Sequence, residues 1–157
     1  MPYKTPVSVL VVIHTPALDV LLLERARHPG FWQSVTGSRE DGEALIETAR
    51  REVREETGID VAMGGIVDWH TSNRYQIFAE WRHRYAPGVT ENTEHVFSLC
   101  LPEPVAVTVA PDEHLAWRWL PWQEAAAACF SWSNRDAILE LPRRLARDMP
   151  EPLHGKP

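Results

Sequence analysis

The sequence predicts a single domain of the α/β (α+β) class. It has 157 residues, of which 44% are hydrophobic and 24% are charged, and these values are close to globular averages. Runs of β-branched apolar residues, typical of strands, recur along the chain, and segments with helical periodicity follow some of them. This composition excludes a disordered, collagen-like or coiled-coil protein. We expect the domain to span residues 1–149 and the proline-rich residues 150–157 to form a frayed tail.

The N-terminal part of the chain predicts three strands. Residues 5–13 (TPVSVLVVI) are β-branched and apolar, as in a buried strand. A turn around Pro16 separates them from residues 20–25 (VLLLER), so these two strands are expected to form a hairpin. Residues 31–35 predict a short third strand that ends near Gly37.

A loop over residues 37–42 is expected to lead into a helix over residues 44–57. One apolar stripe along this helix would consist of Leu45, Ala49 and Val53. Gly58 is expected directly after the helix, because glycine adopts the left-handed backbone conformation at little cost. Ala44 is a weak residue at the helix start, where Ser or Thr would cap the backbone better.

The rest of the chain predicts further strands and two more helices. Extended chain or strands are expected over residues 59–70, 94–101 and 114–120. Residues 71–90 are expected to form a strand that leads into a long functional loop. A proline in the first turn favours a helix over residues 121–129. A last helix is expected over residues 131–148, broken at Pro142.

The charge balance and the cysteines restrict the partners and the compartment. Twenty-two acidic and 16 basic residues give a net charge of −6, whereas nucleic-acid binding needs a broad basic face. The apolar runs are far shorter than the ~20 residues of a membrane span, and the N-terminus has no signal-peptide pattern. Cys100 and Cys129 match no metal-binding spacing and are expected to be reduced, partly buried thiols. We therefore expect a cytoplasmic protein without nucleic-acid or membrane partners, of unknown oligomeric state.

Residues 37–59 (GSREDGEALIETARREVREETGI) contain the pattern G-x5-E-x7-R-E-U-x-E-E-x-G-U, where U is a bulky aliphatic residue. On a helix, Glu52, Glu55 and Glu56 would lie on one face. Such a cluster of like charges destabilises a helix, and it is best explained by a cation above it. Hard oxygen ligands suit Mg²⁺, with Mn²⁺ as a substitute. A charge-rich helix is usually only a solvated face, with pairs such as Arg51–Glu55, but the complete pattern favours the metal site.

This pattern is the signature of the Nudix hydrolases, and the sequence resembles that family. The resemblance implies a mixed β-sheet sandwiched between helices, with the pattern forming a loop–helix–loop, and hydrolysis of a diphosphate linked to another group. It implies Glu52 and Glu56 as the main metal ligands and Glu55 as a further ligand or the base that activates water. Arg51 would orient the glutamates through a salt bridge, and Gly37 and Gly58 would shape the loops. Glu43 would position Arg51 or support the residues around the metal.

Six stretches outside this pattern resemble one Nudix subgroup, the dihydroneopterin triphosphate pyrophosphatases. They are Tyr3–Ile13, Phe31–Ser38, Arg82–Thr90, Asn92–Phe97, Glu113–Leu120 and Ser131–Arg135. The resemblance implies cleavage of dihydroneopterin triphosphate to the monophosphate and pyrophosphate, with Glu113 as a further metal ligand. The substrate contacts that it implies are Lys4, Arg25, Thr36, Tyr75, Phe78 and Ser131.

The residues themselves suggest two further cations for a small-molecule triphosphate. Arg82 and Arg84 lie two positions apart and would point to one side of an extended chain, and cations bind the several negative charges of a triphosphate. Two alternatives stay open. One is a pyrophosphohydrolase of nucleoside triphosphates such as dATP or an oxidised nucleotide. The other is a non-catalytic nucleotide-binding module, although such a module would be expected to lose glutamates that are all present here.

Overall fold

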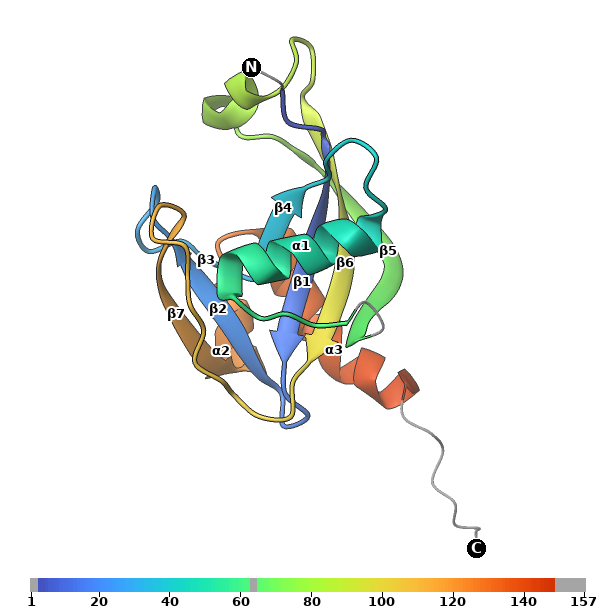
Figure 1. Ribbon diagram of the computed structural model, residues 1–157, viewed down its shortest axis with the longest axis vertical. Coiled ribbons are helices and arrows are strands. Elements are labelled where there is room, and N and C mark those ends of the chain that lie inside the picture. The colour runs from blue at the N-terminus through green and yellow to red at the C-terminus, as the bar shows by residue number, and fades with distance from the viewer. Residues whose placement is uncertain (1–2, 63–64, 149–157) are drawn as a thin grey trace, which may run out of the picture.

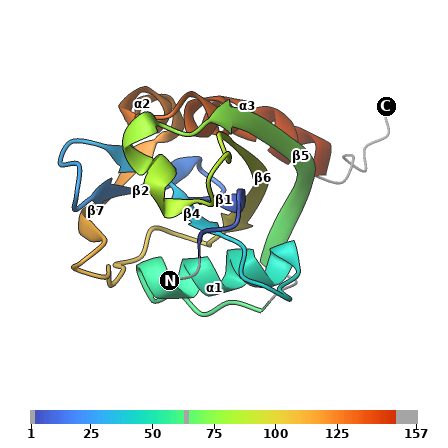
Figure 2. The ribbon, with the colours of Figure 1, turned by 90° about the horizontal axis from the view of Figure 1, so that it is seen from above.

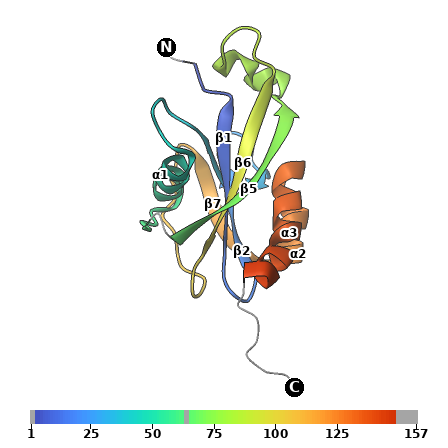
Figure 3. The same cartoon turned by 90° about the vertical axis from the view of Figure 1, so that its right-hand side faces the viewer.

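A seven-stranded mixed sheet separates two layers of helices in the computed structural model, which describes residues 3–62 and 65–148. Helix α1 (Leu45–Thr57) covers one face. Helices α2 (Trp122–Ala128) and α3 (Trp132–Asp148) cover the other face, as Figure 3 shows. The predicted arrangement of a mixed sheet sandwiched between helices is therefore confirmed.

The strands follow the predicted order along the chain (Figure 1). Their bounds are β1 Val7–His14, β2 Asp19–Arg25, β3 Trp32–Gln33, β4 Val35–Ser38, β5 Ile66–Gln76, β6 Glu91–Cys100 and β7 His114–Pro121. Between β5 and β6 the chain forms a short 3₁₀ helix, η2 (Ala79–Arg84), within the predicted functional loop. The main sheet path is β3-β2-β1-β6-β5, with β4 paired to β1 and β7 paired to β2.

Strand β1 has three neighbours, and this splits one end of the sheet. It runs parallel to β6 over its whole length. It meets β2 only at His14 and Val20, so the predicted hairpin exists only beside its turn. β2 pairs with β7 along its whole length. Farther from the turn, β2 also pairs with β3, and β4 lies beside the first half of β1. The two halves of the sheet therefore diverge at the end where β1 begins.

Side chains of β1 alternate between two hydrophobic cores, which explains why nearly all of this strand is apolar. Val9 and Val11 belong to the core under α1. Leu10 and Val12 belong to the core under α2 and α3. Both cores are closed by helices, so each apolar residue of the strand is removed from water.

Helix α1 has the predicted stripe and ends. Ala49 and Val53 are fully buried, and Gly58 follows the helix with a φ of 78°, in the left-handed region. Ala44 is the N-cap and provides no side-chain hydrogen bond. The carboxylate of Glu47 compensates in part, because it accepts a hydrogen bond of 2.8 Å from the Ala44 backbone N–H.

Some predicted boundaries differ from the structure. The predicted break at Pro142 is wrong: α3 continues through this residue, because Leu141 and Leu145 pack into the core on either side of it. The strand predicted at 31–35 is two short strands, and the loop begins after Ser38 rather than at Gly37. Strand β5 begins at Ile66, within the stretch over residues 59–70 that was expected to be extended.

Further predictions concern the C-terminal tail, membrane-spanning helices and the cysteines. The tail predicted at 150–157 and residues 63–64 lie outside the described residues. Within the described residues, no helix combines the length and apolarity needed to cross a membrane. Both cysteines are free thiols; Cys129 is partly buried as expected, whereas Cys100, also expected to be partly buried, is exposed.

Candidate active site

A cleft of about 830 Å³ opens at the end of the sheet where β1 diverges from β2. Residues of β1, β4, α1, η2 and the start of α3 line it. Figure 2 shows η2 over this end of the sheet, between α1 on one side and α2 and α3 on the other. The predicted site residues that line this cleft are Lys4, Arg25, Thr36, Arg51, Glu52, Glu55, Glu56, Tyr75, Phe78, Arg84, Glu113 and Ser131.

Glu52 and Glu56, one turn apart on α1, form the acidic end of the cleft. Glu56 is only 2% exposed. The carboxylate of Glu52 lies against the backbone of Gly37 in β4, in the space that a Cβ atom at this position would fill. Glycine is therefore required at position 37 because α1 and β4 approach so closely there.

Burial raises the pKa of both carboxyl groups. The pKa of Glu52 is raised to about 7, first by burial and further by the charges of Glu55 and Glu113. The pKa of Glu56 is raised well above its usual value by burial and then by Glu52. Burial also lowers the pKa of His114 to about 4. Its Nε2 lies 3.7 Å from Oε1 of Glu56, but this uncharged ring does not neutralise the carboxylates.

The donor set fits a hard divalent cation. Oε1 of Glu56 is buried and, among the described residues, has no hydrogen-bond partner, and buried carboxylates are normally paired or bound to metal. Glu113 is exposed at the start of β7 and lines the same cleft. As the side chains stand, no three His, Cys, Asp or Glu residues in the described ranges are grouped tightly enough to hold a metal ion. For one ion to be held by all three carboxylates, the side chains of Glu52 and of the exposed Glu113 would have to change conformation.

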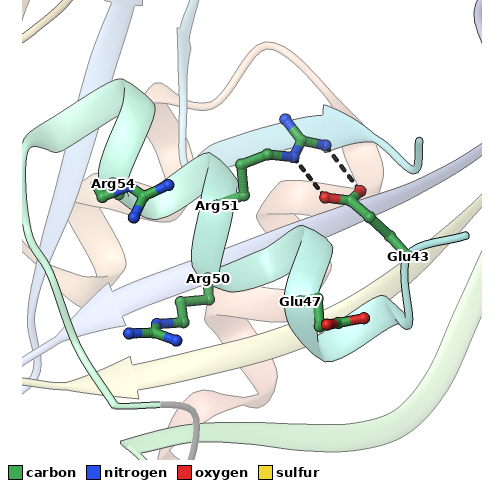
Figure 4. Close-up of a pocket in the computed structure, with 5 residues that line it drawn as sticks. All are labelled: Glu43, Glu47, Arg50, Arg51 and Arg54. Atoms are coloured by element: carbon green, nitrogen blue, oxygen red, sulfur yellow. Dashed lines mark hydrogen bonds and ion pairs between the residues drawn. The ribbon is translucent and has the colours of Figure 1, made fainter. Parts of the chain in front are cut away.

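Arg51 organises the acidic side chains around the helix. Its Nε donates to Oε2 of Glu43 at 2.6 Å and its Nη2 donates to Oε1 at 3.0 Å. Its Nη1 donates to Glu52 and Glu55, each at 3.2 Å. Figure 4 shows the Arg51–Glu43 pair in a second pocket along α1, which Glu47, Arg50 and Arg54 also line. The hydrogen bonds from Arg51 lower the pKa of Glu43 to about 2.

Three cations gather at the cleft near these carboxylates. Burial lowers the pKa of Lys4, and the charges of Arg84 and Arg25 lower it further. The pKa of Arg25 is also lowered, mainly by burial and then by the charge of Arg84. The Lys4 backbone N–H donates to the Arg84 carbonyl at 2.8 Å, which joins the N-terminal segment to η2. Mutually repelling cations indicate a place for an anion with several charges.

Aromatic rings surround the Arg25 side chain. Its guanidinium lies 4.9 Å from the ring centroid of Trp81 and 5.9 Å from that of Phe130. The Phe78 ring lies 5.0 Å from the Trp81 ring and is half exposed. These rings, which are tilted or edge-on to one another, give one wall of the cleft an aromatic surface against which a planar ring can pack.

Arg82 lies apart from the other predicted site residues. It is absent from the lining of the cleft, and its Nε donates to the Ile77 carbonyl at 3.1 Å. The prediction that Arg82 and Arg84 share a side assumed extended chain. The segment is instead the 3₁₀ helix η2, in which residues two apart point in different directions.

Sequence reasoning missed several lining residues, above all Asn92 and Glu94. Both lie in β6 and are almost fully buried. Side chains alternate between the two faces of a strand, so Asn92 and Glu94 share a face with Val96, which belongs to the core under α3. This spacing could have indicated that both are buried. Polar side chains at buried positions of a strand indicate either a hydrogen-bond network or a ligand.

Comparison with known proteins identifies the family. Residues 4–141 match the NUDIX domain model. The chain belongs to the NUDIX domain family. This NUDIX chain is 50% identical, over 87% of its length and 91% of the relative, to the dihydroneopterin triphosphate diphosphatase of Escherichia coli K12. It is 40% identical to the protein of the same name from Haemophilus influenzae, over 94% of each chain.

A solved structure agrees with these relatives. The structure of the E. coli dihydroneopterin triphosphate pyrophosphohydrolase superposes with a TM-score of 0.85 at 47% identity, covering 92% of the NUDIX chain and 99% of the other. Nudix hydrolases generally need divalent metal ions, which agrees with the buried, uncompensated carboxylates of α1.

Proposed function

We propose that this protein hydrolyses dihydroneopterin triphosphate to dihydroneopterin monophosphate and pyrophosphate, a step in folate synthesis. The observation that carries the proposal is the 50% identity over 87% of the chain to an E. coli enzyme named for this substrate. The cleft supports it, because it places acidic and basic groups beside an aromatic wall. The triphosphate can lie along the charged end and the pterin ring along the wall.

Glu52, Glu56 and Glu113 are the residues that would hold Mg²⁺, for which Mn²⁺ can substitute. When bound, such an ion neutralises negative charge on the reacting phosphate. Lys4, Arg25 and Arg84 hold the remaining charge of the triphosphate chain. These cations and the carboxylates together orient the chain for attack by water.

Glu55 is our candidate for the group that takes a proton from the attacking water. Its side chain is half exposed, and Arg51 donates to both of its oxygens, at 3.2 and 3.4 Å. Arg51 acts as a positioning residue, since it also donates to Glu52 and to the Ser38 carbonyl. It thereby fixes α1 against β4.

Thr36, Tyr75, Phe78 and Ser131 are proposed to contact the rest of the substrate. Phe78 belongs to the aromatic wall, and Ser131 lies at the start of α3, where its Oγ accepts a hydrogen bond from the Asn134 backbone N–H. We further propose that residues 1–149 act as one domain, because one cleft draws on β1, α1, β6 and α3 alike. The free cysteines favour a cytoplasmic setting for the reaction.

An initial-rate panel tests the proposal. The purified protein with Mg²⁺ is given dihydroneopterin triphosphate and, separately, the common nucleoside and deoxynucleoside triphosphates, and pyrophosphate is measured against orthophosphate. A higher kcat/KM for the pterin, with pyrophosphate released, supports the proposed function. A flat profile or a preference for dATP overturns the substrate assignment while leaving a Nudix hydrolase. Full activity of folded Glu56→Gln would overturn the proposed metal site.

A further inference from the structure

Two hydrogen-bond acceptors are left without partners at the inner end of the cleft. Glu94 is 4% exposed and Asn92 is 2% exposed, and both line the cleft. Oε1 of Glu94 and Oδ1 of Asn92 have no hydrogen-bond partner among the residues that the structure describes. Unpaired buried acceptors are rare because they have lost their hydrogen bonds to water. They therefore point to a ligand that donates hydrogen bonds.

The groups around Asn92 fix which of its atoms remains available. Its Nδ2 donates to Ser8 Oγ at 2.7 Å and to Tyr75 Oη at 2.9 Å. These two bonds use both amide hydrogens, so the side-chain oxygen is the free group and it can only accept. Ser8 is the β1 partner of Glu94, and Tyr75 is the β5 partner of Asn92, so the sheet holds this arrangement rigidly.

Among the described residues, no Lys or Arg side chain forms an ion pair with Glu94. Burial raises its pKa to about 7, and hydrogen bonding to the hydroxyls of Ser133 and Tyr75 acts in the opposite direction, while Oε1 has no partner among the described residues. No Lys or Arg contributes to its pKa, in contrast to Glu43, which Arg51 holds. A carboxylate in such a place can accept two parallel N–H bonds from a flat ring.

Glu94 and the metal-binding carboxylates serve opposite ends of the cleft. Glu52 and Glu56 belong to α1, on one face of the sheet. Glu94 lies on the same face of β6 as Val96, which packs under α3 on the other side. A substrate with its phosphates at α1 therefore presents its ring to Glu94.

We propose that Glu94, supported by Asn92, recognises the 2-amino-4-oxopyrimidine edge of the substrate. This edge carries a ring N–H next to an amino group, which matches two neighbouring acceptors. Adenine instead presents a ring nitrogen acceptor there, which a carboxylate repels. The inference rests on the proposed function, because this edge belongs to the pterin of the proposed substrate, and guanine shares it.

GTP and ITP provide a matched pair of probes, since they differ only in the 2-amino group. We expect the wild-type protein to favour GTP over ITP in kcat/KM by about 10- to 100-fold, the range for a hydrogen bond to a charged group. Glu94→Gln replaces one acceptor by a donor and should bring this ratio close to one. The loss should fall mainly on KM, because the ring lies away from the reacting phosphate.

Glu91→Gln is the control, with the same substitution on the same strand at an exposed position. It should keep the wild-type ratio. If Glu94 only supports the fold, its substitution lowers the rates with GTP and ITP equally and leaves the ratio unchanged, which overturns the inference. A wild-type ratio near one overturns it without any variant, so the test holds even if Glu94→Gln fails to fold.

Binding of neopterin, a fluorescent ring without phosphates, separates this inference from the proposed function. Fluorescence titration without metal should give Glu94→Gln a Kd at least about 10-fold above that of wild type and of Glu91→Gln. If wild type binds neopterin and prefers GTP to ITP but does not hydrolyse dihydroneopterin triphosphate, the proposed function fails and the ring recognition stands. If wild type hydrolyses that substrate and Glu94→Gln retains both affinity and preference, the ring recognition fails.

Discussion

Glu43, in the loop before α1, holds both Nε and Nη2 of Arg51, at 2.6 and 3.0 Å. The pair joins this loop to α1, the helix that carries the proposed metal ligands Glu52 and Glu56, and both side chains are less than one-fifth exposed. Arg51 is thus held from one side by Glu43 while it donates to Glu52 and Glu55 on the other. The position of Arg51 therefore helps to fix the side chains of Glu52 and Glu55.

Replacing Glu43 by Gln should therefore affect both stability and turnover. We expect a loss of about 1–2 kcal/mol in the free energy of unfolding, since Arg51 would lose a charged partner in a largely buried place. We also expect a lower kcat, because Arg51 would hold Glu55 less firmly. Chemical denaturation and initial rates measure the two effects. Glu40→Gln is the control, since Glu40 is largely exposed and lies 3.8 Å from Arg51.

The contribution of Glu43 should disappear in acid. Its pKa in the folded protein is about 2, below the ordinary 4.5, so the stabilisation is fully present above pH 4.5 and is lost as the pH falls towards 2. The difference in unfolding free energy between wild type and Glu43→Gln should be constant from pH 7 to 5 and shrink below pH 4.5. A difference that stays constant down to pH 3 would contradict the assigned role.

Gly37→Ala should disable the site while leaving the fold in place. The added methyl group would overlap the carboxylate of Glu52, so this side chain has to move, and a displacement of about 1 Å can cost about 100-fold in rate. Gly65→Ala is the control, because a Cβ there meets only ordinary contact with Leu99 at 3.9 Å. Near-normal kcat/KM in Gly37→Ala would show that Glu52 is not needed in its observed position.

Local rules predict α1 and its signature well, since both depend on short-range spacing. Ala49 and Val53 are buried as the periodicity predicts, and Gly58 ends the helix with a positive φ. Glu52 and Glu56 share a face for the same reason. The sequence alone therefore predicts the acidic end of the cleft, because the carboxylates of that end lie within a few turns of a single helix.

The other end of the cleft depends on contacts between distant segments. The parallel pairing of β1 with β6 places Ser8 beside Glu94, and no local pattern predicts that partner. Arg82 and Arg84 point in different directions because they belong to a 3₁₀ helix rather than to the extended chain that was predicted. Pro142 remains inside α3 because packing against the core outweighs its local cost. In each case tertiary structure overrides the local preference.

Mg²⁺ should stabilise the protein more at high pH than at low pH. Without metal, the pKa of Glu52 in the folded protein is about 7, above the ordinary 4.5. The protonated side chain of Glu52 therefore makes its full contribution to the free energy of unfolding below pH 4.5, and this contribution is lost as the pH rises through 7. We expect the increase in Tm caused by Mg²⁺, relative to EDTA, to be greater at pH 8 than at pH 5.5.

The stabilisation by Mg²⁺ at a pH where it binds follows from mass action. Free Mg²⁺ at 100 times its Kd adds about 2.7 kcal/mol, or roughly 5–10 °C in Tm for a domain of this length. Thermal melts at both pH values provide the measurement. Equal shifts at pH 5.5 and pH 8 would contradict binding to the buried carboxylates.

Glu56→Gln should raise the stability of the metal-free protein while removing activity. Ionisation of Glu56 would place negative charge in a fully buried position next to Glu52, which is why its pKa is raised, and the neutral amide avoids this cost. We expect the variant to melt higher than wild type in EDTA and to gain little from Mg²⁺. A lower Tm in EDTA would mean that the carboxylate supports the fold rather than the metal.

Arg84→Gln should weaken substrate binding, whereas Arg82→Gln should not. Arg84 lines the cleft, and its charge affects both Lys4 and Arg25, while Arg82 is turned to the Ile77 carbonyl. Because Arg84 is exposed, water and salt weaken its attraction, and we expect KM for the triphosphate to rise by only about 3- to 10-fold at low salt. Initial rates at 20 and 300 mM salt would measure this, and the difference between wild type and Arg84→Gln should narrow at the higher salt. A larger KM effect from Arg82→Gln than from Arg84→Gln would mean that η2 presents its other face to the substrate.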